Sequence, residues 1–112
     1  MANSDFKLLP GEEILKEGKL NHWKGIENVR GMLYLTNRRL IFISGSFALQ
    51  PHDMYLLLEE LVEVKKYWTM YIAPNGFYVL KTDGKKEKFQ SWKRKGWVEA
   101  IGTMIDGLAT TA

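Results

Sequence analysis

The side chains of this sequence best suited to binding an anion lie near its carboxyl end. They are Lys85, Lys86, Lys88, Lys93, Arg94 and Lys95. The last three fall in the first turn of an expected helix, where positive charge opposes the helix dipole by a few tenths to about 1 kcal/mol per group. A cationic surface for phosphate groups would explain this placement. The alternative is that the long side chains extend from the helix end into water.

A second basic set flanks a polar, glycine-containing segment over residues 21–28, which we expect to be a loop. It consists of Lys19, Lys24 and Arg30. Trp23 lies inside this segment, and two roles are open for it. The indole either enters a membrane interface, where tryptophan is favoured, or covers the end of the protein core.

Groups that could perform catalysis or bind a metal are scattered along the chain. His22 and His52 have no second histidine or carboxylate at the spacing of a helical metal motif. Ser46 does not stand in a nucleophile elbow, and the chain contains no cysteine. On a strand, the adjacent Glu59 and Glu60 would point to opposite faces. We therefore expect no catalytic site, no metal site and no cofactor.

Length and composition indicate a single domain over residues 1–112 that can bury a core without disulfides. The absence of cysteine, of a signal peptide and of an apolar stretch long enough to span a membrane favours a cytoplasmic protein. The net charge is +3, but the charge is unevenly distributed. From residue 65 onward, nine lysines and arginines stand against four acidic residues. This basic half is typical of a protein with an anionic partner, or of a solvated surface.

The clearest structural element is a β-hairpin over residues 31–44, GMLYLTNRRLIFIS. Two apolar runs flank a polar quartet, which predicts a tight turn centred on Asn37 and Arg38. Alternation along the strands then places one set of side chains on the core face: Leu33, Leu35, Leu40 and Phe42. The opposite face is also apolar, with Met32, Tyr34, Ile41 and Ile43. Arg39, at the turn, is expected to pair with a carboxylate such as Glu12 or Glu60.

The other elements are expected from turn signals and from the period of the apolar residues. Strands are predicted over residues 13–23, over 54–64 as two short pieces, and over 65–73, before a turn at Pro74, Asn75 and Gly76. Residues 77–80 should pair with 87–92 around the Asp83–Gly84 turn, and residues 45–53 should form a connection. An amphipathic helix, with Ser91 as its cap, should follow and bury Trp97, Ile101, Met104, Ile105 and Leu108. The elements predict a mainly β protein: a seven-stranded antiparallel barrel or sandwich capped by a carboxyl-terminal helix.

Three segments of the sequence resemble the GRAM domain, a member of the pleckstrin-homology-like superfold. They are LLPGEEIL, the hairpin GMLYLTNRRLIFIS, and KFQSW followed by a helix that bears Trp97. The positions matching the family pattern are Gly11, Glu12, Gly31, Leu33, Tyr34, Leu35, Thr36, Asn37, Arg38, Arg39, Leu40, Ile41 and Phe42. The resemblance implies seven strands and one helix. It also implies that Lys19, Lys24 and Arg30 lie where many pleckstrin-homology domains hold a phosphoinositide, although the Lys-x-Arg pattern of those lipid binders is absent.

Two functions follow as hypotheses. The first is a non-catalytic binding module for an anionic membrane lipid, such as a phosphoinositide, or for a protein, peripheral at membranes. The second is a protein-interaction or self-assembly module without a lipid ligand, suggested by the apolar second face of the hairpin. Nucleic-acid binding is disfavoured, because Trp68 and Tyr71 would lie on opposite faces of a strand rather than form one stacking platform.

Overall fold

The computed structural model describes residues 6–45, 53–69 and 72–111. These residues form seven antiparallel strands and one carboxyl-terminal helix, as the sequence predicts. The strands are β1 (Ile14–Lys24), β2 (Glu27–Thr36), β3 (Arg39–Ser44), β4 (Asp53–Leu57), β5 (Leu61–Thr69), β6 (Ala73–Lys81) and β7 (Lys86–Gln90). A short 3-10 helix, η1 (Leu58–Glu60), joins β4 to β5, and the helix α1 spans Arg94–Thr111.

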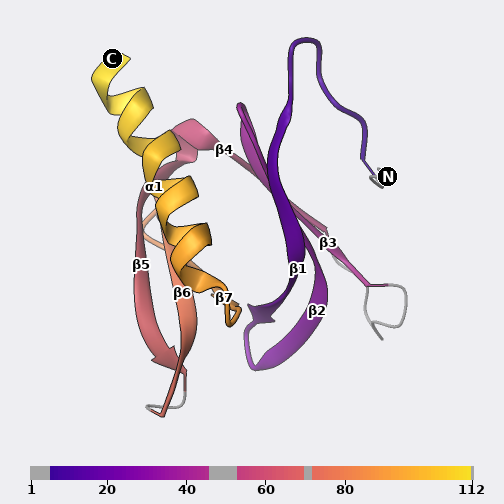
Figure 1. The fold of residues 1–112 in the computed structure, drawn as a ribbon, viewed down its shortest axis with the longest axis vertical. Coiled ribbons are helices and arrows are strands. Elements are labelled where there is room, and N and C mark those ends of the chain that lie inside the picture. Colours follow the sequence, from indigo (N-terminus) through magenta and orange to yellow (C-terminus); the bar gives the residue numbers. More distant parts are fainter. Residues whose placement is uncertain (1–5, 46–52, 70–71, 112) are drawn as a thin grey trace.

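The strands form one curled sheet in the order β4-β3-β2-β1-β7-β6-β5. Its two halves are joined where β1 pairs with β7, from Asn21 opposite Gln90 to Trp23 opposite Lys88. Figure 1 shows that the sheet folds over on itself into a half-barrel, with α1 against β5 and β6. On the amino-terminal side of Asn21, β1 no longer pairs with β7, and the start of α1 borders the space beside this part of β1.

The central hairpin forms as predicted. Leu35 pairs with Leu40 and Leu33 with Phe42, which centres the turn on Asn37 and Arg38. All four apolar side chains are buried in the main core. The alternation of side chains along paired strands is therefore enough to identify this face of the sheet.

The helix also packs with the predicted face inward. Trp97 and Ile101 are almost completely buried, and Met104 and Ile105 pack against the same core, whereas Leu108 is exposed. The helix begins at Arg94, three residues after Ser91, whose hydroxyl accepts a hydrogen bond from the Lys93 N–H (3.0 Å). Lys93 therefore precedes the helix, and of the three basic residues predicted in its first turn only Arg94 and Lys95 lie there.

The second apolar face of the hairpin is covered by the amino-terminal segment of the same chain. Tyr34, Ile41 and Ile43 are buried there, and Phe6 and Ile14 pack on them. The ring of Phe6 meets the ring of Tyr34 edge-on, with centroids 4.9 Å apart. Since burial of apolar surface is favourable, this segment removes the exposed patch that the sequence suggests.

A buried carboxylate fastens that segment to the hairpin. The Glu12 side chain is fully buried and accepts hydrogen bonds from the Thr36 hydroxyl (2.6 Å), from Nε and Nη2 of Arg39 (2.8 and 3.0 Å), and from the Leu9 N–H (2.8 Å). The hydrogen bonds from Arg39 are the main reason that the pKa of Glu12 falls to about 2. Asn37 adds to this latch through hydrogen bonds with the backbone of Gly11 and Glu13. The predicted pairing of Arg39 with Glu12 is confirmed.

The prediction of a loop over residues 21–28 is wrong. β1 continues to Lys24 and β2 starts at Glu27, so Gly25 (φ 64°) and Ile26 alone make the turn. The polar residues of this segment are compatible with a strand because they have partners. His22 is buried and contacts Glu87 at 2.8 Å, and Asn21 hydrogen-bonds to Asn28 on the facing strand.

The turn expected at Pro74, Asn75 and Gly76 is also wrong, because these residues belong to β6. The chain reverses earlier, between Thr69 and Ala73, which pair with each other. Gly76 serves a close approach of strands rather than a turn, since a Cβ there would lie 2.8 Å from the Tyr67 ring.

The remaining strand predictions are mostly confirmed. The ambiguous residues 54–64 form parts of two strands separated by η1. The Asp83–Gly84 turn joins β6 to β7, with Gly84 at φ 85°, and Phe77 pairs with Phe89, although β7 ends at Gln90 rather than at residue 92. Most of the connection predicted over residues 45–53 lies outside the described residues.

Candidate functional site

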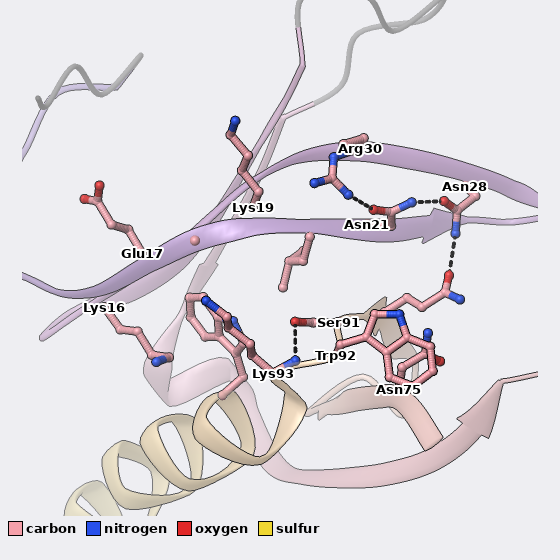
Figure 2. Close-up of a pocket in the computed structure, with 14 residues that line it drawn as sticks. Lys16, Glu17, Lys19, Asn21, Asn28, Arg30, Asn75, Ser91, Trp92 and Lys93 are labelled. Carbon is pink, nitrogen blue, oxygen red and sulfur yellow. Dashed lines mark hydrogen bonds between the residues drawn. The ribbon is translucent and has the colours of Figure 1, made fainter. Parts of the chain in front are cut away.

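An open groove of about 830 Å³ lies between β1 and the turn that joins β7 to α1. We call it the β1–α1 groove. Figure 2 shows that Lys16 extends from β1 toward the start of α1, beside Ser91, Trp92 and Lys93 of the β7–α1 turn, whereas Glu17 and Lys19 extend from the opposite side of β1. Asn21, Asn28, Arg30, Asn75 and Gln90 complete its polar lining, with Gly18, Leu20 and Trp97. A groove of this size is in the range of small-molecule binding sites.

Four cations line the groove: Lys16, Lys19, Arg30 and Lys93. Glu17 is the one acidic residue among the described residues that line it. Within the described part of the chain, none of the four cations takes part in an ion pair. Lys19, Arg30 and Lys93 are also exposed, so their charges are available to a ligand. The groove therefore attracts anions.

A line of hydrogen-bonded side chains orients Arg30 at the groove. Its Nη1 donates to Oδ1 of Asn21 (3.1 Å), which is directly opposite on β1. Asn21 donates to Asn28, and Asn28 donates in turn to Gln90 on β7 (3.0 Å) (Figure 2). These bonds link side chains of three neighbouring strands where β1 and β7 begin to separate, and the Arg30 guanidinium lies at one end of the line.

Lys16 is a groove cation that sequence reasoning missed. Its ammonium lies 5.2 Å from the centre of the Trp97 ring, a cation–π distance, and close to the start of α1 near Gly96. Gly18, two residues along β1, leaves room for the same ring, since a Cβ there would lie 3.4 Å from it. The alternation of side chains along β1 could have identified it, because Lys16, Gly18 and Leu20 share the face of the strand that packs against Trp97.

Asn75 was missed for a different reason, because it was assigned to a turn. In β6 the residue is 5% exposed, and its Oδ1 has no hydrogen-bond partner among the described residues. An unpaired buried amide oxygen is costly, by about 1 to 3 kcal/mol, unless a donor reaches it. Asn75 lines the groove, but this oxygen is shielded from solvent and is not presented to a ligand.

The other basic residues singled out in the sequence do not line the groove. Lys24 is exposed at the end of β1, Lys85 and Lys86 are exposed at the β6–β7 turn and the start of β7, and Lys95 is exposed on α1. Lys88 extends over the Tyr67 ring at 5.8 Å. Of the nine basic residues suggested for an anion, three line the groove: Lys19 and Arg30 from one side of β1 and Lys93 from the other.

Arg94 is held within the fold rather than in the groove. Its Nη1 donates to the backbone carbonyl of Tyr67 (2.8 Å) and to that of Gly76 (3.3 Å). These bonds fasten the start of α1 to β5 and β6. The helix end that borders the groove is therefore anchored by a cation that sequence reasoning had assigned to an anionic partner.

The two tryptophans near the groove differ in exposure. Trp92 lines it from the β7–α1 turn and is 74% exposed. Trp23, expected in a loop, is a partly buried residue of β1 between Asn28 and Lys88.

One cluster of ionisable side chains, also missed from sequence, lies outside the groove. Glu87 is 2.8 Å from both His22 and Lys81, and His22 packs between Phe42 and Phe89. The hydrogen bond to His22 is the main reason that the pKa of Glu87 falls to about 2. His22 is almost fully buried, so this cluster holds β1, β6 and β7 together.

The described residues contain no group of three or more side chains placed to hold a metal ion. Within the same residues, no helix has the length and apolar character required to cross a bilayer.

Solved structures similar to this chain include several pleckstrin-homology domains, whereas none of the curated proteins matches it. The Vps36 N-terminal PH domain superposes with a TM-score of 0.75 at 17% identity, over 93% of this chain and 86% of that chain. The C-terminal domain of an unknown protein from Leishmania infantum gives 0.71 at 18% identity, over 86% of each chain. The Slm1 PH domain in complex with phosphoserine gives 0.65 at 17% identity, over 83% of this chain and 96% of that chain.

At these identities the structural likeness shows the fold alone. A sequence-family model, that of the GRAM domain, matches residues 2–103. The matched span contains the Glu12 latch, the central hairpin and Trp97, which are the features that build this half-barrel. The chain therefore belongs to the GRAM domain family and has the pleckstrin-homology-like fold.

Proposed function

We propose that this chain is a non-catalytic binding module that holds the phosphorylated headgroup of an anionic membrane phospholipid, such as a phosphoinositide, in the β1–α1 groove. The observation that carries the proposal is that four cations without ion-pair partners line one groove of the described structure, Lys16 and Lys93 from one side of β1 and Lys19 and Arg30 from the other. Phosphate oxygens are strong acceptors for ammonium and guanidinium groups.

The lining of the groove is basic and polar, which suits a phosphorylated headgroup. Arg30 is held in place by Asn21 and offers planar donors for a phosphate. Among the similar structures, the Slm1 PH domain is in complex with phosphoserine in one and with inositol 4-phosphate in another. Those ligands combine phosphate with other polar groups.

The proposal places the module at the cytoplasmic surface of a membrane, as a peripheral protein. The alternative, a protein-interaction or self-assembly module, depended on the apolar second face of the central hairpin. That face is covered by Phe6 and Ile14 of the same chain, so it no longer favours a second protein. The groove, with its positive charge, favours the lipid.

The first test is co-sedimentation of the chain with phosphatidylcholine vesicles that either contain or lack a phosphoinositide. We expect binding only when the anionic lipid is present. Raising the salt from about 0.1 M to about 1 M should release the protein, because it shortens the Debye length from about 10 Å to about 3 Å. Absence of binding at low salt, or binding that ignores salt and lipid charge, would contradict the proposal.

A further inference from the structure

The register of the sheet places a row of cations and aromatic rings on the face that points away from the core. Tyr78 of β6 lies directly opposite Lys65 of β5 on one side and Lys88 of β7 on the other. Lys88 in turn lies opposite Trp23 of β1. Residues directly opposite each other share a face of the sheet. Phe77, the neighbour of Tyr78 along β6, is fully buried in the core, so this row points outward.

The neighbouring rows extend this surface. Tyr67 of β5 lies opposite Gly76 on one side of the row, and Lys86 of β7 lies opposite Leu80 on the other side. The helix α1 packs on the core face, through Trp97. The lysines of the outward face are exposed. We call this surface the outer basic face, and it consists of Trp23, Lys65, Tyr67, Tyr78, Lys86 and Lys88.

The two tyrosine rings of the outer basic face turn their flat sides toward solvent. The ammonium of Lys86 lies over the Tyr78 ring, 4.5 Å from its centre, and that of Lys88 lies over the Tyr67 ring at 5.8 Å. Both lysines are exposed, so the ring sides beneath them face outward. The two ring centres are 6.3 Å apart. Gly76 lets the Tyr67 ring lie close to the sheet, because a Cβ there would lie 2.8 Å from a ring atom.

The positive charge of this face is largely uncompensated. Within the described part of the chain, Lys86 and Lys88 take part in no ion pair, and Lys65 contacts Glu63 at 3.8 Å with both side chains largely exposed. Ammonium groups beside flat rings match the two parts of a single-stranded nucleic acid, whose phosphates attract cations and whose unpaired bases stack on aromatic rings. An acidic protein segment would match the lysines alone. A bilayer would leave the rings unused, because they lie along the sheet.

We propose that the outer basic face binds single-stranded nucleic acid, with unpaired bases stacked on Tyr67 and Tyr78 and with phosphates on Lys65, Lys86 and Lys88. None of the six residues of this face lines the β1–α1 groove. The inference therefore goes beyond the proposed function and does not depend on it.

The rings that carry this proposal differ from the pair that the sequence singles out. The sequence places Trp68 and Tyr71 on opposite faces of one strand, and Tyr71 lies outside the described residues. Tyr67 and Tyr78 come from two strands instead. They share a face because β5 pairs with β6, which alternation along a single strand cannot reveal.

The test is the fluorescence anisotropy of a labelled oligothymidylate of about 12 nucleotides, long enough to cross the face. We expect salt-sensitive binding of the single strand, and at least about tenfold weaker binding of the duplex with its complement, whose paired bases cannot stack on the rings. Lys88→Glu should lower the affinity for the single strand about tenfold. Lys95→Glu makes the same charge change on α1, at an exposed site away from the face, and should bind as the wild type does.

Substitutions of the rings test the stacking itself. Tyr67→Thr and Tyr78→Thr should each lower the affinity for the single strand about tenfold, whereas Tyr67→Phe and Tyr78→Phe should retain it, because stacking requires the ring and not the hydroxyl. Threonine is favoured in strands, and thermal unfolding shows whether each variant is folded. The comparison of Lys88→Glu with Lys95→Glu remains decisive even where a threonine variant does not fold.

Several results would overturn the inference. They are no binding of the single strand at low salt, equal affinity for the duplex, and equal losses in Lys88→Glu and Lys95→Glu. Polyglutamate bound as tightly as the oligonucleotide would show a site for acidic proteins instead. If Lys88→Glu and the threonine variants weaken binding to phosphoinositide vesicles but leave the oligonucleotide bound, the face contacts a membrane and the inference is wrong. Binding of vesicles by the wild type tests the proposed function separately, so either can fail alone.

Discussion

Glu12→Gln is expected to lower the free energy of unfolding by about 3 kcal/mol at neutral pH, because it breaks a buried ion pair and leaves Arg39 without its counter-charge. The Glu12 carboxylate is fully buried and accepts four hydrogen bonds, two of them from Arg39. The variant amide presents an N–H₂ group where the Thr36 hydroxyl and the guanidinium now donate. Chemical denaturation with the exposed Glu13→Gln as control measures the difference; similar losses for both variants would refute the latch.

The same carboxylate sets a pH window for stability. Its folded pKa of about 2 lies below the ordinary value of 4.5, so its contribution is complete above about pH 4.5 and is lost as the pH falls toward 2. Glu87, with a pKa also lowered to about 2, acts in the same direction over the same range. We expect Glu12→Gln to weaken the fall in stability with acid but not abolish it, because Glu87 still titrates. A variant whose acid dependence equals that of the wild type would show that Glu12 is not the titrating group.

Reversing two groove charges, Lys19→Glu with Arg30→Glu, is expected to lower the affinity for phosphoinositide vesicles at least about a hundredfold. Each cation near an anionic surface contributes about 1 kcal/mol, and a reversal replaces attraction by repulsion. Both side chains are exposed, so we expect little change in stability. Co-sedimentation over a range of lipid concentrations gives the ratio of affinities.

The matched control carries the same change in net charge at a different place. Lys85→Glu with Lys86→Glu alters the β6–β7 turn and the start of β7, which do not line the groove. We expect this variant to lose only a few-fold in affinity, from the weaker overall attraction. If it loses as much as the groove variant does, the membrane is attracted by diffuse charge, and the groove is not the site.

Much of the fold could be predicted from local sequence signals. The central hairpin and the helix have apolar residues at the period of a strand and of a helix, and burial of those faces dominates the energetics. The two wrong turns show the limit of such signals. Asn21 and His22 read as loop residues because their partners, Asn28 and Glu87, are recognised only after the strands pair. Gly76 reads as a turn residue because its neighbour, the Tyr67 ring, comes from another strand.

The groove could be predicted only in part, because it is made by a separation of strands rather than by a motif. Lys19, Arg30 and Lys93 stood out as unexplained charges. Lys16 and Asn75 are recognised as groove residues only from the structure, which places β1 and β6 beside the start of α1. The sequence shows which residues are charged, but it does not show which of them lie beside one another in the folded chain.

The residues that identify the family have a structural task here. Glu12, Thr36, Asn37 and Arg39 bond to one another or to the amino-terminal backbone, and none of them lines the groove. Their pattern therefore predicts the latch and the half-barrel, and it does not specify a ligand.

The most direct test of the headgroup site is to follow the backbone and side-chain amide resonances of the chain by NMR while soluble inositol phosphate is added. The account predicts that the largest shifts belong to Lys19, Arg30, Asn75 and Lys93, together with the indole N–H of Trp92, and that they saturate with one common affinity. Shifts centred instead on Lys85, Lys86 and Lys88, or no shifts while the vesicles still bind, would contradict it.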